Sequence, residues 1–181
     1  MLDNKAMKRF CITLTLFALA AMCMAADTAE AVMKKAYQDA AKQNKNVLVV
    51  FHASWCGWCH RFDDFLTKSD EGKKVASSYV LVHLDVLESE EKKSEENAGG
   101  EEMMNNWGGK DAGIPFMVVL DKHGKKLADS NRETGKPSTN MGYPAAKEEI
   151  AHFMGLLDKT TKLSASEKAK IRTWLVTNAP K

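Results

Sequence analysis

Two cysteines separated by two residues stand between two different sequence patterns, and this arrangement limits the folds open to the chain. Before them, Val47–Phe51 is a continuous apolar run, which is typical of a strand covered on both faces. After them, apolar residues recur at helical spacing from Phe62 to Leu66. Cys56 and Cys59 are therefore expected where a buried strand is followed by the N-terminus of a helix.

This placement favours reversible disulfide chemistry over a structural cross-link. A thiolate is the nucleophile in disulfide exchange, and a free cysteine, with a pKa of roughly 8.5, is mostly protonated at neutral pH. The unpaired N–H groups and the dipole of a helix N-terminus favour the ionised form by about 0.3–1 kcal/mol at an exposed site. Cys56 is predicted to attack and Cys59 to resolve the mixed disulfide. As a cross-link, so short a loop would contribute only about 2 kcal/mol.

The first 25 residues have the pattern of a signal peptide. Lys5, Lys8 and Arg9 form a basic start, Phe10–Met24 is apolar, and the residues before Ala26 allow cleavage after position 25. The alternative is an uncleaved membrane anchor, although the apolar stretch is at the short limit for crossing a bilayer. The sequence thus predicts a signal peptide at 1–25 and one domain at 26–181.

Removal of this leader would leave a nearly neutral chain. It takes away three basic and one acidic side chain, so totals of 26 and 24 become 23 of each. Binding to nucleic acid would need a clustered positive face, and no nucleic-acid partner is expected. The other two cysteines of the chain, Cys11 and Cys23, also lie in the leader.

Helix and strand patterns alternate along the rest of the chain, which indicates an α/β fold. A helix between the first two strands predicts their parallel pairing, and a turn between the last two predicts a hairpin. The expected helices are 28–43, the stretch after Cys59, one opened by Pro144 and one capped by Ser164 and Glu167. The expected strands are 47–53, 79–86, 116–120 and 126–128.

The order of three features resembles the thioredoxin-like family. They are a buried strand ending in Trp55 and the cysteine pair, a parallel strand after a crossover, and Gly113-Ile114-Pro115 before the hairpin. The resemblance covers about 28–158 and implies a thioredoxin-like three-layer sandwich, a mixed central sheet flanked by helices. The helix capped by Ser164, at about 164–178, would be an extra C-terminal helix added to this core. The resemblance also implies that Pro115 is cis, and that Trp55, Ile114 and Pro115 form a surface on which an extended peptide docks.

The proton relay of thioredoxins is altered in this chain. The family has a buried acid on the strand before the motif, and the matching residue is Val50. His83, on the neighbouring strand, is a candidate proton acceptor for Cys59, the alternative being a partly buried histidine with a structural partner. His52 is expected on the face of the strand away from the thiols.

The residues around the cysteines lean toward a reductase. Gly57 and Trp58 stand where thioredoxins have Gly-Pro, while oxidising and isomerising relatives often have histidine at the second position. Ile114, before the proline, is the thioredoxin-like choice. This preference is slight, because a change of 30 mV in the reduction potential corresponds to about 1.4 kcal/mol, which one hydrogen bond to a thiolate can supply.

Two stretches are inserted relative to a minimal thioredoxin. Residues 88–102 are rich in glutamate and are expected to form a solvated helix or loop without chemistry. Residues 131–143 form a long loop that is expected to border the substrate groove.

Two other kinds of site remain open from the sequence. The run from Cys56 to His60 also matches the attachment signature of c-type haem, with His60 as axial ligand. Two cysteines beside a histidine could instead hold copper or zinc. Against haem, the run is embedded between a buried strand and an amphipathic helix.

Taken together, the sequence predicts a secreted, periplasmic thiol-disulfide oxidoreductase that acts on protein disulfides and leans toward reduction. Its redox centre would be the Cys56–Cys59 disulfide, with no other cofactor and no metal. The expected partners are protein disulfide substrates and an upstream thiol electron donor or acceptor. Contact with the membrane is expected only if the leader is retained.

Overall fold

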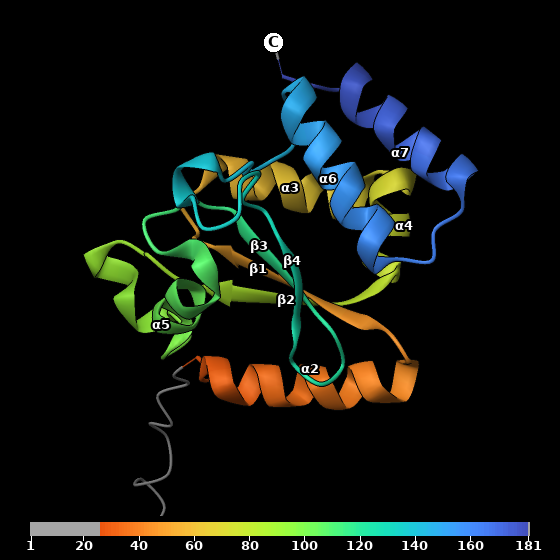
Figure 1. Cartoon of the computed structure of the whole chain (residues 1–181). Helices are drawn as coiled ribbons and strands as arrows, with labels where there is room; N and C mark the ends of the chain where they lie inside the picture. The colour runs from red at the N-terminus through yellow and green to blue at the C-terminus, as the bar shows by residue number, and fades with distance from the viewer. Residues whose placement is uncertain (1–25, 181) are drawn as a thin grey trace, which may run out of the picture.

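The computed structural model describes residues 26–180, and a four-stranded sheet lies at its centre (Figure 1). The strands are β1 (Asn46–His52), β2 (Tyr79–Asp85), β3 (Phe116–Leu120) and β4 (Lys126–Asp129). Their order in the sheet is β2-β1-β3-β4. β1 pairs in parallel with β2 and antiparallel with β3, and β3 pairs antiparallel with β4. The mixed sheet, the parallel pair and the hairpin are as predicted.

Helices cover both faces of this sheet. They are α2 (Ala29–Gln43), α3 (Gly57–Lys68), α4 (Asp70–Ser77), α5 (Gly100–Met104), α6 (Lys147–Thr160) and α7 (Ala165–Thr177). Figure 1 shows α2 on one face and α3 and α6 on the other. α4 and α7 contribute to the core on the side of α3 and α6, while α5 lies at one end of the sheet. Shorter turns occupy Glu90–Glu95 and Pro137–Thr139, which are 3-10, and Asn105–Gly109, which is π-type.

Burial of β1 on both faces explains why its sequence does not alternate. Val47, Val49 and Phe51 point into the cluster under α2, whereas Leu48 and Val50 point into the cluster under α3 and α6. None of the five is more than 1% exposed. Since each face of the sheet has its own helical layer, every position of the central strand has to be apolar.

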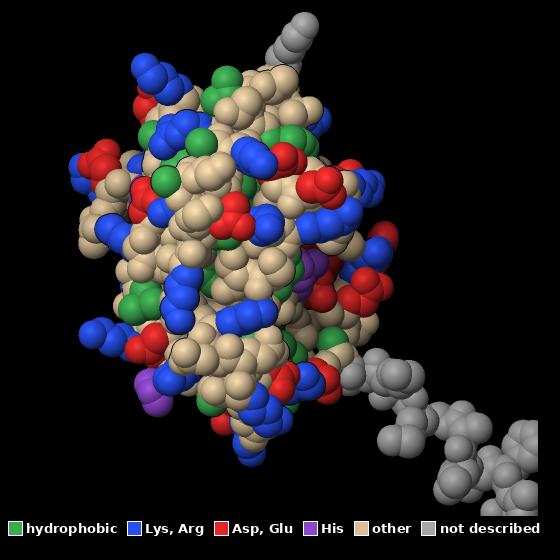
Figure 2. Space-filling model, turned by 90° about the vertical axis from the view of Figure 1, so that its right-hand side faces the viewer, with side chains coloured by type: hydrophobic (Ala, Val, Ile, Leu, Met, Phe, Trp, Pro, Cys, Tyr) green, Lys and Arg blue, Asp and Glu red, His purple; other side chains and the backbone are tan. Residues whose placement is uncertain are grey.

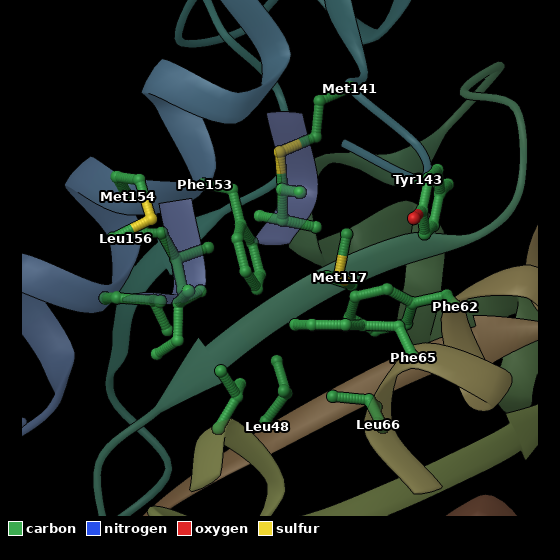
Figure 3. Packing of buried hydrophobic residues seen from close by; sticks show 14 of the residues in the cluster. Leu48, Phe62, Phe65, Leu66, Met117, Met141, Tyr143, Phe153, Met154 and Leu156 are labelled. Atoms are coloured by element: carbon green, nitrogen blue, oxygen red, sulfur yellow. The ribbon is translucent and has the colours of Figure 1, made fainter. Parts of the chain in front are cut away.

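Aromatic side chains fill the core between the sheet and α6. Figure 3 shows Phe62 and Phe65 of α3 gathered with Phe153 of α6 near Met117 of β3. The ring of Phe153 lies 6.1 Å from that of Phe62 and 6.3 Å from that of Phe65. Each fully buried phenylalanine contributes about 1.5–3 kcal/mol to folding. This layer fixes α3, and with it the cysteine pair at its first turn.

The structure adds a helix that the sequence patterns did not predict. Ser69 ends α3 and begins α4, because its hydroxyl donates to Phe65 O (2.8 Å) and accepts from Gly72 N–H (2.9 Å). Gly72 lies close to the backbone at the end of α3, and a β-carbon on it would be only 1.8 Å from Phe65 O, so a larger residue does not fit without a shift. The helix has only 8 residues, too few for a clear periodic pattern.

The two C-terminal helices begin at capping residues. α6 starts at Lys147, three residues later than the start predicted from Pro144, because the Glu149 carboxylate accepts from the N–H groups of Ala145 and Ala146. α7 has the predicted capping box of Ser164 and Glu167.

Charges of both signs are mixed on the face of the molecule in Figure 2, which fits the nearly equal numbers of acidic and basic residues. Within residues 26–180, no helix is both long and apolar enough to cross a membrane. The predicted signal peptide, including Cys11 and Cys23, lies outside the described residues.

Candidate active site

The cysteine pair forms a disulfide at the N-terminus of α3. Cys56 and Cys59 are joined, with their Cα atoms 5.2 Å apart. Cys56 is the N-cap residue of α3, and its sulfur accepts the N–H of Cys59 at 3.1 Å. No acidic side chain lies in the first turn of this helix. In the dithiol form the same N–H and the helix dipole would stabilise a thiolate on Cys56.

The two sulfur-bearing residues differ in their surroundings. Cys56 retains 4% of its exposed surface and Cys59 only 1%. The flanking side chains of Trp55 and Trp58 are 60% and 51% exposed. Cys56 is therefore slightly more exposed than Cys59, and exposed indoles stand on the residues next to it in sequence and between the two cysteines.

The element Ile114-Pro115 lies against this disulfide. The peptide bond between the two residues is cis, as the resemblance implied. Ile114 packs on the small cluster formed by Ala53, Cys56 and Cys59. The carbonyl oxygen of Ile114 lies 3.6 Å from Cys56 Sγ, a contact only, since a disulfide sulfur carries no hydrogen. Of the predicted docking residues, Ile114 and Pro115 thus lie beside the disulfide, and Trp55 precedes Cys56 in the chain.

Val50, which occupies the position of the buried acid of thioredoxins, is apolar and buried. Val50 is 1% exposed and pairs in the sheet with His83 of β2 and Met117 of β3. His83 Nε2 lies 2.8 Å from Asp63 Oδ1 of α3, so the candidate proton acceptor already has a carboxylate partner. This contact also links β2 to the helix that carries the thiols.

The prediction for His52 was wrong. Its ring lies 5.0 Å from that of His83, on the face of the sheet that α3 covers. Successive side chains of a strand point to opposite faces, so His52 shares the face of Val50, two residues earlier. Burial, and then the neighbouring His83, lower the pKa of His52 below its ordinary value. His52 Nε2 is 3.2 Å from Asp85 Oδ1, but the angles do not allow a hydrogen bond. This buried nitrogen therefore has no hydrogen-bond partner among residues 26–180.

The first inserted stretch reaches the turn before Cys56, a contact that was not predicted from the sequence. Both oxygens of the Glu88 carboxylate accept hydrogen bonds from Ser54, from its N–H at 2.5 Å and from its hydroxyl at 2.8 Å. The indole N–H of Trp55 donates to Leu87 O at 2.8 Å. Glu88 is 7% exposed. A signal was present, because the carboxyl ends of the parallel strands β1 and β2 lie at one edge, and residues just after them meet there.

The second inserted stretch also reaches the site. The ring of Tyr143 stacks on that of Trp58, with centroids 6.0 Å apart, and Arg61 lies over both rings. A groove of about 600 Å³ runs between this pair, Ile114 and the loop around Asn140. Burial raises the pKa of Tyr143 above its ordinary value, although Arg61 opposes the shift, so its hydroxyl stays protonated at neutral pH. The prediction that residues 131–143 border a groove beside the site agrees with this geometry.

The residues considered for haem or metal have other partners. The two sulfurs are bonded to each other, and His60 Nε2 lies 2.7 Å from Ser54 O. Across residues 26–180, no group of three or more His, Cys, Asp or Glu side chains is arranged to hold a metal ion.

Comparisons with known proteins agree with the fold. A family model described as thioredoxin-like matches residues 28–122. A disulfide bond reductase, DsbH, of Chlamydia pneumoniae is 27% identical over 103 residues, which are 56% of this chain and 61% of the relative, so the chain spans less than two thirds of that protein.

Solved structures resemble the chain at lower identity. A disulphide isomerase from Xylella fastidiosa Temecula1 is 20% identical, with a TM-score of 0.49, over 82% of this chain and 89% of that one. A solved structure of a DsbH oxidoreductase is 23% identical, with a TM-score of 0.45, over 75% of this chain and 85% of that one. Since the family model matches more than half of its residues, the chain belongs to the thioredoxin-like family.

Proposed function

We propose that this protein is a thiol-disulfide oxidoreductase that exchanges protein disulfides through Cys56 and Cys59. The observation that carries the proposal is the disulfide at the N-terminus of α3, with Ile114 packed against it. The relative from Chlamydia pneumoniae, a disulfide bond reductase, supports the same activity. The redox-active disulfide would be the only cofactor.

The proposed reaction starts from the dithiol form. Cys56 thiolate attacks one sulfur of a client disulfide, a bond forms between them, and the other client sulfur leaves as a thiolate that takes up a proton. Cys59, after losing its proton, attacks Cys56 and releases the second client thiol. Two electrons pass to the client, and Cys56 and Cys59 end as the disulfide seen in the structure.

The side chains around the disulfide would divide the remaining work. Trp55 and Trp58 would flank the client, Gly57 would keep the first turn of α3 open, and Ile114 with Pro115 would form the edge on which an extended peptide lies. No neighbouring atom lies within 4 Å of where a β-carbon of Gly57 would be, which supports open space at that point.

His83 remains a proposal as the proton acceptor for Cys59. It lies on the face of the sheet that α3 covers, and its contact with Asp63 would stabilise the imidazolium after it accepts a proton. Where the family has an acid this chain has Val50, and His83 is the residue that pairs with it on the next strand.

We further propose a compartment and a direction. The sequence of residues 1–25 favours export, so the domain at 26–181 would act in the periplasm, and a retained leader would anchor it to the membrane. Net reduction in an oxidising compartment requires an upstream thiol donor, which would reduce the Cys56–Cys59 disulfide after each turnover.

Two variants test this function. Cys56→Ser should abolish dithiol-driven reduction of insulin, because no attacking sulfur remains. Cys59→Ser should accumulate mixed disulfides with clients, because the resolving sulfur is missing. The mechanism would be contradicted if Cys56→Ser reduced insulin as fast as the wild type, or if Cys59→Ser formed no mixed disulfides. Equilibration with glutathione then gives the reduction potential and so the direction.

A further inference from the structure

The loop formed by residues 131–143 holds the Ile114-Pro115 element through one side chain. Asn140 Nδ2 donates to Gly113 O at 2.5 Å and to Pro115 O at 3.1 Å. Its Oδ1 accepts the N–H of Gly142 at 3.2 Å. The amide thus bridges the carbonyl groups on either side of Ile114 and bonds to neither polar atom of Ile114 itself.

The chemistry of these contacts requires a carboxamide. Two carbonyl oxygens can be satisfied together only by a group with two N–H donors, and the third contact needs an acceptor on the same side chain. An aspartate has the same shape but, when ionised, would place an oxygen against both carbonyls. Asn140 is therefore specified by its contacts with the element beside the disulfide.

The loop is fixed at its base, so that Asn140 can position what it touches. Ser130 is fully buried, and its N–H donates to Met117 O while its hydroxyl accepts from Met117 N–H, both at 2.9 Å. Met141 N–H then donates to Ser130 O at 2.9 Å. These bonds tie the loop on both sides of Asn140 to β3, which is itself part of the sheet core.

The same loop shapes the groove next to the disulfide. A β-carbon at Gly142 would be 3.9 Å from Pro115 Cδ, so the loop backbone lies directly against the proline. Tyr143 then stacks on Trp58 and closes one side of the groove of about 600 Å³. One short stretch of chain therefore lies against both Pro115 and Trp58.

We propose that residues 131–143 form the substrate-positioning element of this site, with Asn140 as the positioning residue that holds Ile114 ready to pair with an extended segment of a client protein. This inference rests on the proposed oxidoreductase function and deepens it. The element acts on the docking of peptide clients and leaves the Cys56–Cys59 couple itself unchanged, so a small disulfide such as glutathione does not depend on it.

The test compares Asn140→Asp with Asn106→Asp. Both make the same change from amide to carboxylate, but Asn106 is exposed, lies outside residues 131–143 and does not line the groove, so it is the matched control. Asn140→Asp should raise KM for insulin at least fivefold, with kcat and the equilibrium constant with glutathione within about twofold of wild type. Asn106→Asp should leave all three unchanged. Asn140→Ala, which removes the donors without adding charge, should raise KM in the same direction if the aspartate variant fails to fold.

The outcomes separate the two proposals. Wild type that does not reduce insulin would refute the proposed function, whatever the loop variants do. Active wild type with an unchanged KM in both Asn140 variants would refute the role of the loop alone. A glutathione equilibrium that shifts as much as KM would show that Asn140 acts on the disulfide itself, which would also overturn the inference.

Discussion

Replacing Glu88 with alanine removes the carboxylate that holds the turn immediately before Cys56. Glu88 is buried and accepts both the N–H and the hydroxyl of Ser54. Hydrogen bonds to a charged group contribute about 1.5–3 kcal/mol each, and the two share one acceptor residue, so we expect a combined loss of about 2–4 kcal/mol in the free energy of unfolding. For a domain of this size that corresponds to a decrease in Tm of roughly 5–15 °C.

The loss in the free energy of unfolding caused by Glu88→Ala should depend on pH, and it should be larger at neutral than at acidic pH. Burial alone would raise the pKa of Glu88, but the hydrogen bonds from Ser54, with Lys92 nearby, lower it below the ordinary value. An acid whose pKa is lower in the folded than in the unfolded state adds stability above its unfolded pKa and loses it as the pH falls through the folded pKa. The difference between wild type and Glu88→Ala should therefore be full at pH 6–8 and shrink below about pH 4.

Urea denaturation of the oxidised proteins measures this effect, with Glu91→Ala as the control. Glu91 lies on the same inserted stretch and is exposed, so its removal takes away the same charge without a contact to the turn. A loss below about 0.5 kcal/mol in Glu88→Ala, or an equal loss in Glu91→Ala, would refute the reasoning, since exposed acidic residues rarely contribute more.

Two further predictions concern the core and the histidine pair. Phe153→Ala should lower the free energy of unfolding by about 3–5 kcal/mol, measured by urea denaturation, because it empties the fully buried space among Phe62 and Phe65; a loss under 1 kcal/mol would contradict this packing. His52 has a lowered pKa in the folded state, so the unfolded chain binds its proton more readily and stability should fall as the pH drops below about 6.5; His52→Gln should flatten that part of the pH profile, and an unaltered profile would exclude the assignment.

Local patterns were sufficient to predict the elements that carry the thiols. Residues close in sequence make up both the apolar run of β1 and the helical spacing of Phe62 and Leu66 in α3. The same holds for the capping box at Ser164, which begins α7. α4 was missed because Ser69 makes two contacts, one to each helix, that no periodicity displays. The error for His52 was avoidable, since counting two residues on from Val50 places it on the same face.

The contacts that complete the site could not be predicted in this way. Glu88 is 34 residues from Ser54, and Asn140 is 27 residues from Gly113. Which side chain meets which carbonyl depends on the path of an inserted loop, and loops of this length follow few sequence rules. The glutamate-rich stretch was therefore expected to be solvated and without chemistry, and only residues 131–143 were expected to border a groove, without the individual bonds.

The two inserted stretches divide the support of the site between them. Glu88 hydrogen-bonds Ser54 in the turn that joins β1 to α3 and leads to Cys56. Asn140 hydrogen-bonds Gly113 and Pro115, which precede β3. The turn before Cys56 and the residues on either side of Ile114 are therefore held by different loops, which share no hydrogen bond within residues 26–180. If Cys56 attacks and Ile114 docks the client as proposed, Glu88→Ala should act mainly on the turn before Cys56 and Asn140→Asp mainly on the segment around Ile114, although Ile114 itself packs against Cys56.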